Sequence, residues 1–271
     1  MASLKRIAWM STQAALRTYV AAESLVWIIG MPIVLSLVLS LWMGGASGSP
    51  WADAGLSDAG IAYETPRGDA AALEYPAMSR VFGVYLIFVF SALITRSGAI
   101  HEEARRGTLQ RALAMGVPHW EIVAAHGTGL VLVGLVQAVA FFGVTGLLGT
   151  PWLASGWSAV ALPVAGAILA AAGVAVGIAG FVRSGPLLQM IGGGGPSMLA
   201  MMGGAFFPLD VAPAGVQRLA FLNPVHWAVE ALSGGFVYKG LESQAAPLAV
   251  LLLFAVAGAV IGVQGLRRDE A

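Results

Sequence analysis

Ionisable side chains are scarce in this chain, and the densest group of them lies in residues 100–113 (IHEEARRGTLQRAL). This segment holds two glutamates and three arginines, whereas Asp, Glu, Lys and Arg together make up only 10% of the 271 residues. Carboxylates and guanidinium groups at this density can form polar contacts with a soluble partner. They can also belong to a solvated loop that only fixes membrane topology, and the segment alone does not separate these two interpretations.

The second half of this segment has the pattern of a short amphipathic helix. Apolar and polar side chains fall on two different faces at helical spacing. The apolar face holds Leu109, Ala112 and Leu113, and we assign Arg105, Arg106, Gln110 and Arg111 to the other face. Thr108 is the expected N-cap. The turn at 116–118 (GVP) is expected to end the helix.

Several kinds of site are excluded by composition. The chain has no cysteine, so it has no disulfide, thiolate metal site or cysteine nucleophile. The four histidines are expected to lie at the surface or at an interface and to form no metal site. A formal net charge of zero gives no reason to expect a nucleic-acid partner. The only lysines, Lys5 and Lys239, lie outside any G-x-x-x-x-G-K-[ST] pattern, so we expect no ATP or other cofactor in this chain.

The remainder of the sequence predicts an all-α integral membrane protein. Hydrophobic residues make up 58% of the chain, and the mean hydropathy is +0.82. A helix needs about 20 apolar residues to cross the bilayer core. Six such stretches are present. They lie at about 25–43, 81–95, 127–148, 157–182, 186–207 and 246–266. We expect residues 1–271 to form a single transmembrane domain, in which the first span is not cleaved.

The basic residues predict the orientation of these spans. With the N-terminus inside, ten of the 14 Lys and Arg residues fall in cytoplasmic pieces, as the positive-inside rule requires. The protein is then a multi-pass protein of the cell membrane with both termini on the cytoplasmic side, and residues 96–121 form the first cytoplasmic loop. Residues 5–23 are predicted to form an amphipathic helix on the inner membrane face. The acidic outer loop at 44–80 is too short for a domain with its own core.

The predicted spans contain no ionisable residue, which argues against a proton- or sodium-coupled carrier. An apolar path suits an apolar or amphipathic cargo such as a lipid, glycolipid, drug or natural product. Polar and adaptable side chains in the spans are candidates for cargo contact, with plain packing as the alternative. They are Gln137, Gln189, Met198 and Met202. The glycine run at 192–195 is expected to allow close helix packing or a kink.

Two stretches resemble the permeases of type-two ABC transporters. The first is EEARRGTLQRALAMGVPHWEIV, in which Glu102, Glu103, Gly107, Thr108 and Leu109 match the family pattern. The second combines GGAFFPLDVAP at 203–213 with LNPVHWAVEAL at 222–232. The chain departs from the pattern at Arg105, at Gly116 and at 125–126, where the family has an acidic residue, Pro and Gly-Lys. The resemblance covers essentially the whole chain.

The resemblance implies that the charged segment is a coupling helix docking on a separate ATPase. Its residues would be Glu102, Glu103, Arg105, Arg106, Gly107, Thr108, Leu109 and Arg111. It also implies a re-entrant outer segment between spans five and six that forms a plug or gate; a packed outer turn is the alternative. The gate would comprise Phe206, Phe207, Pro208, Asn223, Pro224 and Glu230.

The implied assembly contains two permeases, either two copies of this chain or a copy and a paralogue, in contact with membrane lipids. Two ATPase subunits would bind ATP and Mg. The chain itself is then a non-catalytic permease subunit of an exporter. The alternatives are an ATP-independent secondary carrier or channel and a membrane enzyme. For the enzyme, the spans offer no Ser–His or paired-Asp arrangement.

Overall fold

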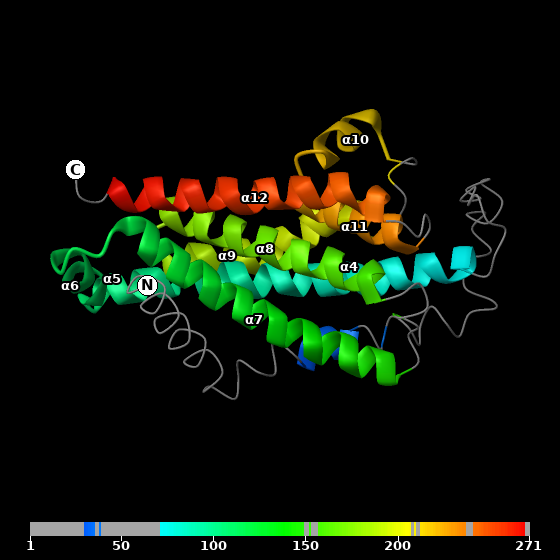
Figure 1. The fold of residues 1–271 in the computed structure, drawn as a ribbon, viewed down its shortest axis with the longest axis horizontal. Helices are drawn as coiled ribbons and strands as arrows, with labels where there is room; N and C mark the ends of the chain where they lie inside the picture. The colour runs from blue at the N-terminus through cyan, green and yellow to red at the C-terminus, as the bar shows by residue number, and fades with distance from the viewer. Residues whose placement is uncertain are drawn as a thin grey trace.

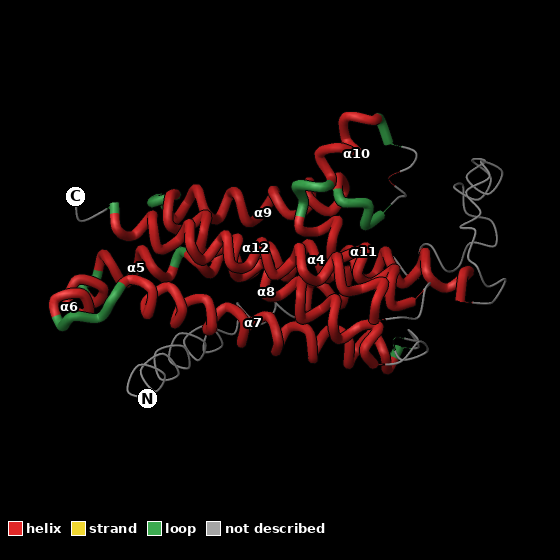
Figure 2. Tube along the Cα trace, turned by 45° about the horizontal axis from the view of Figure 1, so that its top comes forward, coloured by secondary structure: helices red, strands yellow, loops and turns green. Residues whose placement is uncertain are grey.

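The computed structural model describes residues 30–35, 38, 71–148, 152, 157–206, 209, 212–236 and 241–268. Within these ranges every regular element is helical (Figures 1 and 2). The predicted interfacial helix at 5–23, most of the first span, most of the outer loop, Phe207 and Pro208 lie outside the described residues.

In the part of the chain that the structure describes, five long helices form the bundle and four shorter ones connect or flank them. The long helices are α4 (Ala71–Ser97), α7 (His119–Leu147), α8 (Trp157–Phe181), α9 (Gly185–Met202) and α12 (Leu241–Arg267). The short helices are α5 (Ala99–Arg105), α6 (Thr108–Ala114), α10 (Ala214–Ala220) and α11 (Pro224–Phe236). Helices α5 and α6 lie at the end of the bundle where α12 finishes, and α10 lies toward the other end (Figure 1).

Among the described residues, four helical stretches are long and apolar enough to cross a membrane. They are Val81–Arg105, His119–Leu147, Trp157–Phe181 and Leu241–Arg267. Helix α9 covers the predicted fifth span but is not one of the four, because its glycines, its two prolines and Gln189 dilute its apolar content. It ends at Met202, before the predicted limit of 207, where Gly203 and Gly204 follow.

Helix α8 is the central helix of the bundle and packs against α4, α7, α11 and α12. Its contact with α12 is the closest. An added Cβ atom at Gly173 would overlap the backbone of Ala255, and one at Gly258 would overlap the carbonyl group of Gly173. Glycines on both helices therefore let the two backbones meet without intervening side chains, as is common between membrane helices.

An aromatic cluster fills the space between α4 and α7. Tyr85 lies 5.4 Å from Phe141 and 4.9 Å from Phe142, measured between ring centroids. Trp152 closes the cluster: its ring is 4.8 Å from that of Phe142, and its indole N–H donates to Thr145 Oγ1 at 2.9 Å. These contacts fix α7 against α4, the helix that leads into the charged segment.

Candidate functional site

The charged segment forms two helices: α6 is the short helix that the second half of the segment predicted, and α5 precedes it. Gly98 connects α4 to α5 with helical dihedral angles (φ −61°, ψ −15°), so α5 continues the direction of α4 with little interruption. Gly107 then takes a left-handed conformation (φ 72°), which L-residues with a side chain rarely adopt, and the chain turns into α6. Arg105 and Arg106 therefore belong to the end of α5, and their predicted place on the face of α6 is wrong.

The predicted capping role of Thr108 is also wrong. The N-cap of α6 is Gly107, which has no side chain to offer, and Thr108 is the first helical residue. Its hydroxyl group instead donates to the carbonyl oxygen of Glu103 at 2.9 Å. This bond reaches back across the turn and holds α6 against α5.

Glu102 holds the two arginines of α5 together. Its carboxylate accepts hydrogen bonds from Arg105 Nη2 at 2.5 Å and from Arg106 Nε at 3.0 Å. The side chains are well exposed, 79% for Arg105 and 65% for Arg106, so each pair adds only about 0.2–1 kcal/mol to stability. The pairs therefore set the distribution of charge on this surface and contribute little to the stability of the fold.

Helix α6 packs by its apolar face and leaves its polar face exposed. Leu109, Ala112 and Leu113 are partly buried against the hydrophobic core, as their spacing predicts. Arg111 is exposed on the other side. Met115 and Trp120, which flank the turn after α6, are 76% and 51% exposed. Together these three side chains give the end of the bundle a cationic and apolar surface.

One contact joins α5 to the long helix α7. Glu103 Oε2 lies 3.4 Å from Nε2 of His126, which is 10% exposed. Nδ1 of His126 lies 3.0 Å from the carbonyl oxygen of Ile122 and must donate there, because a carbonyl only accepts. Attraction between Nε2 and the carboxylate therefore requires a second proton on His126. The pair ties the charged segment to α7 most strongly when His126 is charged.

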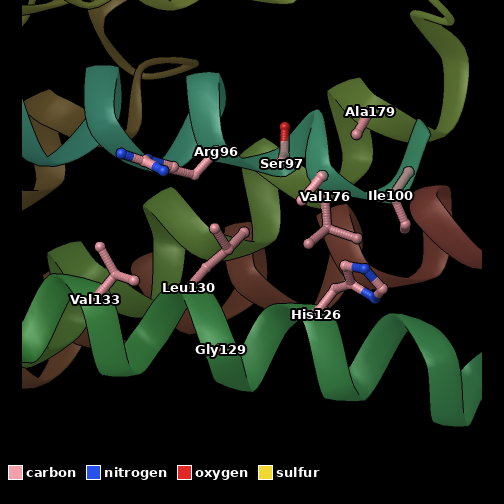
Figure 3. A pocket seen from close by; sticks show the side chains of 10 residues that line it. Arg96, Ser97, Ile100, His126, Gly129, Leu130, Val133, Val176 and Ala179 are labelled. Carbon is pink, nitrogen blue, oxygen red and sulfur yellow. The ribbon is translucent and has the colours of Figure 1, made fainter. Parts of the chain in front are cut away.

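A small cavity of about 30 Å³ lies beside this pair. Figure 3 shows His126 of α7 opposite Ile100 of α5, with Val176 of α8 close by and Leu130 one turn farther along α7. The guanidinium group of Arg96 points away from His126 in this view. The cavity has room for about one or two water molecules, so it is too small for any cargo.

A much larger groove, of about 1310 Å³, runs along α4 and α9 and reaches α5. Its floor forms where the two helices touch: Ser91 Oγ donates to the carbonyl oxygen of Gly192 at 2.5 Å. Of the glycine run, Gly192 packs closely on α4, whereas an added Cβ atom at Gly193 would meet open space. The run therefore provides close packing on one side and an open groove wall on the other.

The four predicted cargo-contact residues do not lie together. Gln189 lines the groove. Met198 is 68% exposed farther along α9, and Met202 is partly buried at the end of that helix. Gln137 is 1% exposed on α7, inside the bundle. Only the three residues of α9 can share a surface.

Those predicted gate residues that the structure describes lie at the other end of the bundle, and Asn223 makes the main contacts there. Asn223 is 4% exposed, and its Nδ2 donates to the carbonyl oxygen of Leu199 at 2.6 Å. Its Oδ1 accepts from the backbone N–H of Val225 at 3.0 Å, in the first turn of α11. Pro224 starts α11 and is buried, whereas Phe206 is partly buried and Glu230 is exposed. Asn223 thus joins the end of α9 to the start of α11.

His226, one turn further along, packs against the same junction. It is 7% exposed, and its ring lies 5.6 Å from the ring of Phe221. Burial holds the pKa of His226 below its usual value, while the charge of Glu230 acts in the opposite direction. The imidazole is therefore neutral at neutral pH, which suits its apolar surroundings.

Replacing Asn223 by alanine is expected to destabilise the protein by about 2–3 kcal/mol. The N–H of Val225 would lose its acceptor, and the carbonyl of Leu199 would lose one of two donors, since Gly203 N–H also bonds to it. The melting temperature of purified protein in detergent measures this. Gln217→Ala is the control, because Gln217 Nε2 donates to the carbonyl of Ala212 at the half-buried edge of α10. Equal melting temperatures for the two variants would contradict a special role of Asn223.

Sequence reasoning missed three places where distant segments come together. Arg96 and Arg183 line one groove although α7 and α8 separate them in the chain. The contact of His126 with Glu103 was not predicted, although His126 stands out as a departure from the family pattern. The buried amide of Gln244 donates to the carbonyl oxygens of Ala159 and Ala231, joining α12 to α8 and α11. No periodicity in the sequence signals any of these.

Comparison with known proteins gives two matches. The family model described as ABC-2 type transporter matches residues 5–237. The linearmycin resistance permease protein LnrN of Bacillus subtilis is 30% identical over 161 residues. That alignment covers 57% of this chain and 40% of the relative, so the match spans less than half of the relative's length.

Proposed function

The chain belongs to the ABC-2 type transporter family, and from this premise we propose that it is the transmembrane subunit of an ATP-driven exporter. Its cargo is an apolar or amphipathic molecule: a lipid, a glycolipid, a drug or a natural product. A separate ATPase subunit supplies the energy. Members of this family are membrane subunits of transporters, and ATP hydrolysis resides in a partner, so this chain is not the enzyme of the complex.

The observation that carries the proposal is the position of the charged segment relative to the groove. Helix α4 forms one wall of the groove and continues through Gly98 into α5. A force applied to the α5–α6 segment therefore acts directly on that wall. When His126 is protonated, its pairing with Glu103 carries the same force to α7. Docking of α5 and α6 on an ATPase that closes on ATP would move the helices around the cargo.

The exposed residues at this end suit a protein partner. Arg111, Met115 and Trp120 combine a cation with two apolar side chains, and Met, Trp and Arg are enriched at protein interfaces. The same end of the bundle also carries the charged side chains of α5 and its C-cap, which are Glu102, Glu103, Arg105 and Arg106. In the proposed complex this end is cytoplasmic, both termini lie on that side, and six spans cross the cell membrane.

The full assembly in this proposal contains two ATPases, which bind ATP and Mg, and two permeases. The second permease is a copy of this chain or a paralogue. At the other end, the residues around Asn223 form the outer gate. The word "resistance" in the name of the relative supports outward movement of a harmful compound, and so supports export.

Co-purification tests the proposal. The chain is expressed with candidate ATPase subunits, and the ATP hydrolysis of the complex is measured in nanodiscs against a panel of lipids and drugs. A stable complex whose rate rises about fivefold or more with an amphipathic compound is expected. Failure to retain any ATPase, together with uptake driven by an ion gradient in liposomes, would establish the alternative of a secondary carrier.

A further inference from the structure

Helix α9 contains a proline whose missing hydrogen bond is replaced from a neighbouring helix. Pro196 lies inside α9 and has no backbone N–H, so the carbonyl oxygen of Gly192, four residues earlier, loses its donor within the helix. Ser91 Oγ of α4 donates to this carbonyl oxygen at 2.5 Å. A hydroxyl group of α4 therefore takes the place of the missing backbone donor.

The same replacement also occurs in α8. Pro163 leaves the carbonyl oxygen of Ala159 without its helical donor, and the buried amide of Gln244 in α12 donates to that oxygen at 3.3 Å. Pro163 is itself buried, and an added Cβ atom at Gly235 of α11 would overlap both Ala159 and Gln244. Close packing from two other helices therefore fixes α8 around its proline.

The residues just before Pro196 are less enclosed. They are glycines at 193–195, and no neighbouring segment that the structure describes comes within 4 Å of an added Cβ atom at Gly193 or Gly194. Glycine restricts its backbone least of all residues, because it has no side chain. Sharp bends in helices occur mostly at prolines. Pro196 and the glycines before it therefore form the place where α9 can change its direction.

The two halves of α9, residues 185–191 and 197–202, are held by different parts of the bundle. In the second half, the carbonyl oxygen of Leu199 accepts from Asn223 Nδ2 at 2.6 Å, next to the start of α11. In the first half, the side chain of Leu188 is buried beside Gly98, where an added Cβ atom would lie 3.6 Å from Leu188 Cδ1. Gly98 joins α4 to α5. The first half therefore contacts the junction that leads into α5 and α6.

We propose that residues 192–196 form a hinge in α9 and that the first half of the helix tilts about it, which changes the width of the groove at its α5 end. The pivot is Gly192, since its backbone lies against Ser91 and Thr95 of α4 and an added Cβ atom would overlap Thr95 Oγ1. A movement of α5 would reach the first half through Leu188. The hinge belongs to the chain itself, but its use in transport rests on the proposed export function. The groove-lining residues of the first half are Gly185, Pro186 and Gln189.

A double-variant cycle tests the role of Ser91. Ser91→Ala is expected to lower the melting temperature of the purified protein by about 3–8 °C, because the carbonyl oxygen of Gly192 loses its donor. In the Pro196→Ala background the same change is expected to have little effect, since residue 196 then supplies a backbone N–H. An equal loss in both backgrounds would overturn the compensation of the proline by Ser91.

The matched control is Thr128→Ala on α7. Thr128 Oγ1 donates to the carbonyl oxygen of Ala124 at 2.7 Å, but this oxygen keeps the backbone N–H of residue 128 as its donor within the helix. The melting temperature is therefore expected to change by no more than about 1–2 °C. A loss as large as that of Ser91→Ala would show that the missing proline donor plays no special part.

Spin labels test the hinge in the chain alone. The chain has no cysteine, so introduced cysteines carry the only labels. One pair joins Met190→Cys in the first half of α9 to Leu253→Cys of α12. The other joins Met201→Cys in the second half to the same reference, and all three positions are exposed. A change of about 20° in the bend moves Met190, six residues from Pro196, by about 3 Å.

The distance distribution of the Met190 pair in nanodiscs is expected to be about 3 Å broader than that of the Met201 pair. Pro196→Ala is expected to remove this difference. Labelled chain is diluted with unlabelled chain, so that only distances within one chain are measured. Equal widths for the two pairs, or a difference that Pro196→Ala leaves unchanged, would overturn the hinge.

The complex with the ATPase separates the hinge from the function. Mg-ATP is expected to shift the mean distance of the Met190 pair by about 3 Å and to leave that of the Met201 pair unchanged. If cargo-stimulated ATP hydrolysis occurs without this shift, the export function stands and the role of the hinge in transport is overturned. If no ATPase binds, the function fails, and the spin-label result for the chain alone still decides whether the hinge exists.

Discussion

Alanine in place of Gly258 is expected to lower the melting temperature of the purified protein by about 5–10 °C, and leucine to leave little folded protein in the membrane. The added Cβ atom would overlap the carbonyl group of Gly173, which belongs to the backbone of α8 and cannot rotate away. Helices α8 and α12 would have to separate along their whole contact. Since α8 also packs on α4, α7 and α11, the separation would loosen the bundle.

The matched control for this prediction is Gly143→Ala on α7. Gly143 is exposed on an apolar helix, and nothing lies within 4 Å of an added Cβ atom there. Alanine favours helix over glycine by about 0.5–1 kcal/mol, so this change should be neutral or slightly stabilising. Replacing glycine by alanine is thus expected to lower the melting temperature at Gly258 and to leave it unchanged or raise it slightly at Gly143. Equal melting temperatures for both variants would show that α8 and α12 are less closely packed than described.

The helical fold class and the approximate positions of the long helices can be predicted from the sequence, because apolar stretches in a membrane must form their backbone hydrogen bonds within the helix. The residues at which the helices begin and end are harder to predict. Helix α7 begins at His119, before the predicted span at 127, because polar residues form helix as readily as apolar ones once they leave the bilayer. Close packing at Gly173 and Gly258 was not predicted, because it depends on which faces of two distant helices meet.

The local part of the candidate site was more predictable than its long-range part. Leu109, Ala112 and Leu113 lie on one face because helical spacing alone decides it. The N-cap of α6 was predicted at Thr108 and lies one residue earlier, at Gly107, since either glycine or threonine can precede a helix and the left-handed φ angle of Gly107 is not visible in the sequence. The groove was not predicted at all, because α4 and α9 are brought together by the fold and by the bond between Ser91 and Gly192.

Charge reversal at Glu102 and Glu103 is expected to uncouple ATP hydrolysis from cargo, reducing cargo stimulation about tenfold. Lysine at 102 would place three cations within one turn of α5, where Arg105 and Arg106 now share a carboxylate. Lysine at 103 would face His126 and break the link between α5 and α7. The α5–α6 segment would then lose its fixed position relative to the helices around the groove. The measurement is cargo-stimulated ATP hydrolysis of the complex in nanodiscs, for each single variant and for the pair.

This loss would be separable from misfolding and from misinsertion. The two ion pairs of Glu102 are exposed and contribute only about 0.2–1 kcal/mol each, so the bundle of the Glu102 variant should fold without them. Added lysines in this segment would strengthen the positive charge that keeps it inside, so topology should not change. Glu242→Lys is the control, because it reverses an exposed carboxylate in the first turn of α12, at the far end of that helix from α5 and α6. Full cargo stimulation in the Glu102/Glu103 variants would mean that this segment does not transmit motion, and that coupling passes through another surface of the protein.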